Sequence, residues 1–269
     1  MKKIAFCFLI YDTINHEEIW KLFFNNVDPS KYNIYIHYKI NKPLKYFDNY
    51  KLDNCIETKY GDISLIKAQD LMYKEALKDK DNKFFINLSN SCIPLKNFHH
   101  IYNSLLENYS YFNICNQDSC FPRCNYLLNS LPKKSIQKSS AWCILNRKHT
   151  ELIVNDKQHI NWFDITKTFS ELVYPDEHSY ITYIYHSNLE NEIITTPNLA
   201  NGATTFTNWQ GMDYKYPSTR GLKNYSFISQ EELHYLMNSQ CLFGRKFLPE
   251  CIQSLCNKDY LHFISNNHY

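Results

Sequence analysis

The sequence has little net charge, few glycines and no long apolar run. Its 269 residues carry a formal net charge of +2, without the basic excess that nucleic-acid-binding proteins usually show, so no nucleic-acid partner is expected. Only 5 glycines stand against 22 tyrosines and 17 phenylalanines, which excludes a flexible or low-complexity chain. No window approaches the roughly 20 apolar residues that a transmembrane helix requires, so no membrane span is expected.

The amino terminus has a basic start and an apolar run, as a signal peptide does. The run from Ile4 to Tyr11 is short, ends at Asp12 and lacks a small-residue cleavage site. It therefore predicts a buried first strand. We expect a soluble, cytoplasmic protein made in a reducing compartment, and the lack of an anchor favours a viral or microbial setting.

The 10 cysteines and the histidines do not form a zinc-binding pattern. Most cysteines lie singly in apolar surroundings, where a thiol behaves as a small hydrophobic group. Cys115, Cys120 and Cys124 lack paired CxxC spacing and a nearby histidine. His178 and His186 are too far apart in sequence to chelate from adjacent turns. No metal is expected, and without a secretion signal no disulfide is expected.

Strand and helix signals alternate in the first half of the chain. Strand patterns occupy residues 4–11, 32–38, 83–89 and 111–116, and helical patterns occupy 17–26, 64–77 and 98–109. Ser64 is placed to cap the second of these helices. The alternation predicts an α/β fold, a mixed sheet flanked by helices, and no linker divides residues 1–269, so a single domain is expected.

The second half is less regular. Strands are predicted at 139–146, 192–196, 204–209 and 241–247, and helices at 147–155, from Pro175 onward, at 230–239 and near the carboxyl terminus. Ser229 and Glu232 have capping-box spacing. Residues 42–51 and 118–138 are predicted as long loops. Because ligands bind outside the carboxyl ends of strands in such sheets, the site is expected near Asp12, His37, Ser89–Ser91 and Asn116.

One short segment gathers ionisable residues. Pro175, Asp176, Glu177 and His178 stand together at the head of an apolar run. Proline at the first helical position and acids in the first turn are common helix openings, so position alone leaves a plain helix start, a metal site and an acid-base centre open.

Several sequence blocks together resemble one family. In order, "KFFINLSNSCIPLKNFHHIYN", "SSAWCILNRKHTELIV", "VYPDEHSY" and "CLFGRKF" are similar to the core-2/I-branching β1,6-N-acetylglucosaminyltransferases and their peptide O-xylosyltransferase relatives. "YNIYIHY" and "GDISLIKAQ" match blocks nearer the amino terminus. The resemblance spans residues 4–247.

The resemblance implies an inverting glycosyltransferase of GT-A type that works without a divalent metal. No Asp-x-Asp follows a strand at the expected place, where "LSNSC" stands instead. The implied donor is a UDP-sugar, with UDP-N-acetylglucosamine first and UDP-xylose second, and the implied acceptor is a glycan or glycoprotein hydroxyl.

By similarity to the family's "PDE" motif, Glu177 is the general base. Its expected place near the positive end of a helix dipole would favour the ionised form that a base needs. Asp176 is assigned to the acceptor side, as a capping or loop-bonding acid rather than a second catalyst.

Cations must hold the leaving diphosphate if no metal does. "FGRKF" matches the segment that carries the family's diphosphate-binding lysine, which is Lys246 here. The partner arginine of the family maps to Lys223, with Arg220 nearby, so the identity of the second cation stays open. The alternative for Lys246, Lys223 and Arg220 is that each is an ordinary solvated charge on the surface.

The remaining candidates line the expected cleft. His37, Ser64, Ser89 and Asn90 match positions near the nucleotide-sugar. A hydrogen-bonded structural histidine and serines that cap helices are the alternatives, and Lys39 stands where the family tends to have aspartate.

Two tryptophans are assigned to the acceptor site. Trp209 matches an aromatic block of the family whose ring could stack on a sugar. Gly211 stands where branching enzymes have an aromatic residue. Trp142 would line the core or the pocket. A buried structural role is the alternative.

Two other functions compete. One is a catalytically inactive nucleotide-sugar- or glycan-binding protein, suggested by Lys39 and the uncertain second cation. The other is a metal-dependent transferase that uses Asp176, His178 or the acids around Asp118.

Overall fold

A computed structural model describes residues 2–115, 121–164, 173–195, 204–208 and 222–267. The strands are β1 Lys3–Ile10, β2 Tyr32–Tyr38, β3 Asn82–Ser89, β4 Ile93–Pro94, β5 Ser110–Phe112, β6 Ile144–Asn146, β7 Ile193–Thr195, β8 Thr205–Thr207 and β9 Phe243–Arg245. The helices are α1 Glu17–Phe23, α2 Ser64–Leu77, α3 Phe98–Ser104, α4 Phe121–Cys124, α5 Arg147–Asn155, α6 Gln158–Phe163, α7 Ser179–His186, α8 Gln230–Asn238, α9 Ile252–Leu255 and α10 Lys258–Ser265.

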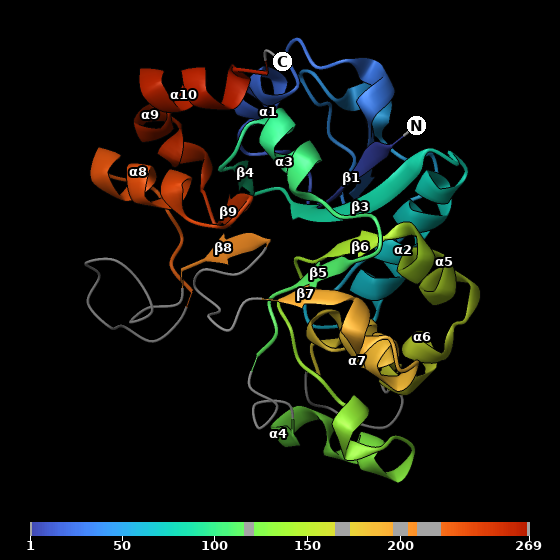
Figure 1. The fold of residues 1–269 in the computed structure, drawn as a ribbon. Helices are drawn as coiled ribbons and strands as arrows, with labels where there is room; N and C mark the ends of the chain where they lie inside the picture. Colours follow the sequence, from blue (N-terminus) through green and yellow to red (C-terminus); the bar gives the residue numbers. More distant parts are fainter. Residues whose placement is uncertain (1, 116–120, 165–172, 196–203, 209–221, 268–269) are drawn as a thin grey trace.

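The strands form two sheets. The larger has the order β2-β1-β3-β6-β5-β7, and the smaller has the order β4-β9-β8. In the larger sheet β1 pairs in parallel with β2 and β3, whereas β6 runs antiparallel to β3 and β5. Helices α2, α5, α6 and α7 gather on one side of this sheet, and α1 and α3 lie toward the other (Figure 1). The predicted α/β fold with a mixed sheet is confirmed.

The first strand shows why this sheet is central. Ala5 and Cys7 belong to the core cluster shared with α2, α5 and α7, whereas Phe6 and Phe8 belong to the cluster shared with α1 and α3. Successive side chains of a strand point to opposite faces, so an apolar run without alternation is expected where both faces are covered.

Trp20 joins the two sheets. Its indole nitrogen donates a hydrogen bond to the Cys92 carbonyl over 3.0 Å, and its ring lies 6.1 Å from that of Phe243 in β9. On the other side the ring meets Phe8 of β1 edge-on at 4.9 Å. This packing fixes β9 relative to the carboxyl ends of β1 and β3.

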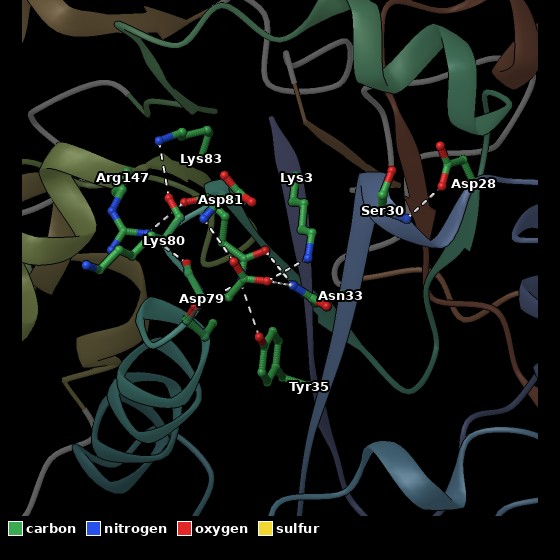
Figure 2. A network of polar contacts seen from close by, with 12 residues as sticks. Lys3, Asp28, Ser30, Asn33, Tyr35, Asp79, Lys80, Asp81, Lys83 and Arg147 are labelled. Atoms are coloured by element: carbon green, nitrogen blue, oxygen red, sulfur yellow. Dashed lines mark hydrogen bonds and ion pairs between the residues drawn. The ribbon is translucent and has the colours of Figure 1, made fainter. Parts of the chain in front are cut away.

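The amino ends of β1, β2 and β3 are closed by a polar network around Asp79 (Figure 2). Its carboxylate accepts hydrogen bonds from Lys3 and Asn33, each over 2.8 Å. The Lys3 contact is the main reason why the pKa of Asp79 falls to about 2. Asp79 and Asp81 form an Asp-x-Asp sequence, but it lies before β3 and Asp79 is engaged in this network.

Several predicted elements differ from those observed. The helix predicted at 98–109 ends at Ser104, because Leu105 is extended with φ −86° and ψ 124°. Of the strand predicted at 139–146, Ile144–Asn146 forms β6, whereas Ser139 forms an isolated antiparallel bridge with Ile114. The predicted loop at 118–138 contains α4 and two 3₁₀ turns.

Of the two predicted helix caps, one is absent and one is present. Ser64 does not cap α2: its hydroxyl accepts a hydrogen bond from the Lys59 amide, and the N-cap residue is Ile63. Ser229 does cap α8 by accepting from the Glu232 amide over 3.1 Å. The Glu232 carboxylate instead pairs with Lys223 and Tyr225.

Candidate active site

Glu177 ends a 3₁₀ turn, Pro175–Glu177, that follows Tyr174 in the left-handed conformation with φ 53°. The helix expected from Pro175 therefore begins only at Ser179, with His178 as its N-cap, and Glu177 precedes its first turn. The Glu177 carbonyl accepts from the Ser139 amide over 2.8 Å. A positive φ in a bulky residue is costly, and such residues are found most often at functional sites. This turn is therefore our candidate for the position of the catalytic carboxylate.

Two cations face the Glu177 carboxylate. Its Oε2 atom lies 3.4 Å from Nζ of Lys138 and 3.6 Å from a guanidinium nitrogen of Arg123. The same oxygen is buried and accepts no hydrogen bond in the part of the chain described. Glu177 is thus an acid whose free oxygen is held by charge alone.

Asp176 lies beside Glu177 but in a drier place. Its Oδ1 atom is buried and has no hydrogen-bond partner within the described ranges. Burial, followed by repulsion from Glu177, raises the pKa of Asp176 to about 6, while the charge of Arg245 acts in the opposite direction. The two neighbouring carboxyl groups therefore differ in their surroundings, and Glu177 alone is paired with Arg123 and Lys138.

His178 is buried and forms a hydrogen bond with the backbone. Its Nδ1 lies 3.0 Å from the Gln137 carbonyl, and burial lowers its pKa to about 4, so the neutral ring donates this hydrogen bond. Over the described ranges, no three His, Cys, Asp or Glu side chains gather as a metal site would require.

Arg245 and Lys246 form the second charged feature. The Arg245 guanidinium lies 4.3 Å above the ring of Trp142, and its Nε is buried with no hydrogen-bond partner among the described residues. Burial lowers the pKa of both side chains, and for Lys246 the charge of Arg245 adds to the effect. In the described part of the chain no carboxylate lies within ion-pair distance of either cation. Two adjacent cations in a partly buried place are stabilised by a bound anion.

Backbone contacts place this pair at the carboxyl edge of the large sheet. The Phe247 amide donates to the Ser91 carbonyl over 3.0 Å, and the Phe247 carbonyl accepts from the Asn15 side chain over 2.7 Å. Asn90 donates to the same Asn15 side chain over 3.3 Å. Ser89 contacts Ser91 and Cys92 within this turn rather than capping α3, whose cap is Asn97. The turn after β3 and the end of β9 therefore meet where ligands of α/β proteins bind.

His37 and Ser64 each accept a hydrogen bond from the backbone of the loop between them. His37 Nε2 accepts from the Ile56 amide over 2.9 Å, and Ser64 Oγ accepts from the Lys59 amide over 2.9 Å. Burial lowers the pKa of His37 to about 4, as a neutral acceptor requires. The loop between them carries Tyr60, whose ring centroid lies 5.6 Å from that of Tyr174.

Lys223 lies in a buried cluster on the side of α8. Its Nζ is 3.5 Å from Oε1 of Glu232 and 4.3 Å from the centre of the Tyr225 ring. Tyr225 donates to the same Glu232 oxygen over 2.7 Å. This arrangement favours a structural role for Lys223. Trp209 and Arg220 lie outside the described residues.

The site includes residues that the sequence did not single out. Arg245 stood inside the quoted "FGRKF" block next to Lys246, so its position was available and only its role was missed. Arg123 and Lys138 lie in the predicted loop at 118–138, and Tyr60 lies in a segment to which no element was assigned. Their approach to Glu177 and Tyr174 depends on contacts between distant segments, which no local pattern reveals.

Comparison with known proteins identifies the family of the chain. Residues 4–237 match the model of one family, described as "Core-2/I-Branching enzyme". The chain belongs to the core-2/I-branching enzyme family. The resemblance inferred from the sequence blocks is confirmed over residues 4–237, which include "VYPDEHSY" but not "CLFGRKF". The assignment to a family of glycosyltransferases is confirmed with it.

One relative of this branching-enzyme chain is the glycosyltransferase BC10 of Oryza sativa subsp. japonica. The two are 27% identical over 164 residues, which is 58% of this chain and 41% of the relative. The chain thus aligns with less than half of that protein's length. Among solved structures, an active-site mutant of LgtC is similar over 70% of this chain and 71% of its own, with a TM-score of 0.37 and 7% identity. None of the helices in the described ranges is both long and apolar enough to cross a bilayer.

Proposed function

We propose that this branching-enzyme chain is an inverting, metal-independent glycosyltransferase. It moves a sugar from a UDP-sugar, N-acetylglucosamine first and xylose second, to a glycan or glycoprotein hydroxyl. The observation that carries the proposal is the combination of a candidate base, Glu177, with two adjacent cations elsewhere in the chain, Arg245 and Lys246, that form no ion pair with a described carboxylate. A GT-A-type arrangement of donor and acceptor is expected from the family.

Glu177 is the base. The acceptor hydroxyl gives its proton to Glu177 as its oxygen attacks the anomeric carbon of the donor sugar. A new carbon–oxygen bond forms on one face of the sugar while the bond to the diphosphate breaks on the other, and its electron pair leaves with UDP. One displacement inverts the anomeric centre.

Arg245 and Lys246 hold the leaving group. UDP gains negative charge as the bond breaks, and fixed cations stabilise charge that develops in a transition state. The Trp142 ring holds the Arg245 guanidinium from one side, which leaves the planar group oriented before substrate arrives. Arg245 therefore fills the place of the second cation better than Lys223, whose charge is paired with Glu232.

The test is transfer by Glu177→Gln. Loss of a general base typically costs about 10²–10⁴-fold in rate, so the variant should lose transfer by about this factor while it binds UDP as the wild type does. Transfer and hydrolysis are measured with UDP-N-acetylglucosamine and UDP-xylose in EDTA. Glu190→Gln, at an exposed glutamate, is the matched control.

Equal turnover by wild type and Glu177→Gln would defeat the assignment of the base. UDP binding by a wild-type protein that turns over neither donor would identify a nucleotide-sugar-binding protein instead. Activity that EDTA abolishes and manganese restores would identify a metal-dependent transferase.

A further inference from the structure

The charges around the two carboxyl groups are divided between two sides. Glu177 has Arg123 and Lys138 within 3.6 Å of Oε2. Asp176 instead experiences the charge of Arg245, which is next to Lys246. If the diphosphate takes the second pair, the first pair remains at Glu177, which the acceptor hydroxyl must reach to give up its proton.

The first pair is also in excess. One carboxylate oxygen faces two cations, and the contacts are long for ion pairs, without a hydrogen bond to that oxygen among the described residues. Arg123 keeps 40% of its side chain exposed and Lys138 keeps 20%, so both can be reached from solvent. Glu177 alone does not neutralise them.

Aromatic rings adjoin this positive charge. The Arg123 guanidinium lies 4.3 Å over the Tyr174 ring, and Tyr60, which is 77% exposed, meets Tyr174 edge-on at 83°. An exposed tyrosine beside a backbone held at positive φ is an unusual surface feature. A ring of this kind offers an apolar face for the C–H groups of a sugar, while the neighbouring cations offer sites for an anion.

We propose that Tyr60, Tyr174, Arg123 and Lys138 form an acceptor subsite for a sugar that carries an anionic group, a carboxylate or a phosphate. This inference rests on the proposed function, because it names the acceptor of the same transfer. The anionic group draws Arg123 and Lys138 toward itself and leaves Glu177 Oε2 free to take the hydroxyl proton. A neutral sugar leaves both cations on the base.

The experiment measures binding first, so that it does not depend on turnover. Methyl glucuronide, glucose 6-phosphate and neutral methyl glucoside are titrated into the full chain with saturating UDP at low salt, followed by ligand-observed NMR. The account expects at least one acidic sugar to bind about tenfold or more tightly than the neutral one, a difference equivalent to ~1.4 kcal/mol. Its advantage should shrink as salt screens the charges.

The variants locate the effect. Arg123→Gln and Lys138→Gln should each remove about tenfold of the preference, whereas Lys134→Gln, an exposed lysine on the neighbouring 3₁₀ turn, should keep it. The affinity for UDP should be the same in all three variants. Comparison of the titrations with methyl glucuronide and glucose 6-phosphate shows which anionic group the site prefers.

Equal affinity for acidic and neutral sugars would overturn the inference, as would an equal effect of Lys134→Gln. Donor turnover is followed in the same samples. If the chain turns over the donor but binds acidic and neutral sugars equally, the acceptor subsite is wrong and the proposed function stands. If the chain prefers acidic sugars but neither binds UDP nor turns over the donor, the proposed function is wrong and only an acidic-sugar-binding site remains. Weaker UDP binding in Arg123→Gln would assign that cation to the donor and also overturn the inference.

Discussion

At the scale of single residues, two adjacent carboxyl groups are set apart by their surroundings. Glu177 faces cations, whereas a buried oxygen of Asp176 has no hydrogen-bond partner in the described part of the chain. Pairs of titratable groups with different environments are a frequent basis of acid-base chemistry. The same contrast gives Asp176 a measurable effect on stability.

Asp176 should destabilise the fold above its pKa. Its pKa is raised from 3.8 to about 6, so the folded state binds the proton more tightly than the unfolded state does. Stability should therefore fall as pH rises between these values, by on the order of 2–3 kcal/mol in all, since one pKa unit is ~1.4 kcal/mol. Asp176→Asn should unfold at a higher temperature than wild type at pH 7.5 and at nearly the same temperature at pH 4. If the difference in unfolding temperature between Asp176→Asn and wild type were the same at pH 7.5 and pH 4, this assignment would be contradicted.

Candidate residues could be singled out from the sequence only where they stand in a short motif. Glu177 and Lys246 stand in blocks that the sequence alone singles out, and the segment of Lys246 lies against the turn after β3 that holds Ser89 and Asn90. Arg245 follows from the same block once Trp142 is known to stack on it. Arg123, Lys138 and Tyr60 could not be found, because burial and long-range packing decide where loop residues meet.

At the scale of elements, Glu177 lies in the turn before α7, and Lys223 lies in the segment before α8. The Lys223–Glu232 pair ties the segment at Lys223 to α8, and Glu232 is only 2% exposed. Removing one partner of a buried pair leaves an uncompensated charge, which is the main cost of breaking such pairs.

Lys223→Met should therefore act on stability rather than on UDP. The expected loss in free energy of unfolding is about 3 kcal/mol, measured by urea denaturation. Adding Glu232→Gln should recover much of it, because the neutral side chain still accepts from Tyr225. A variant that keeps its stability but loses UDP affinity would instead make Lys223 a diphosphate cation.

Strong periodicity predicted elements better than it predicted their ends. The bounds of α2 and α5 matched because each has an unbroken apolar stripe between clear boundary residues. The helix predicted from Pro175 begins only at Ser179, because Tyr174 is left-handed and Pro175–Glu177 form a 3₁₀ turn, which the apolar pattern does not reveal. The two-residue strand β4 gave no pattern to detect.

At the scale of the whole molecule, the site forms where the two sheets meet. β9 of the smaller sheet brings Arg245 and Lys246 to the carboxyl ends of β1 and β3, and Trp20 packs between β1 and β9. The charge of Arg245 acts to lower the pKa of Asp176, the neighbour of Glu177. A diphosphate would bind between parts of both sheets.

The affinity for UDP in EDTA tests the central claim most directly, because the account has two protein cations do what a divalent ion does elsewhere. Wild type should bind UDP without metal, and Lys246→Met should bind it about tenfold or more weakly, with Lys134→Met unchanged as the control. Isothermal titration measures all three. Wild-type binding that appears only when manganese is added, or equal affinities in wild type and Lys246→Met, would contradict the account.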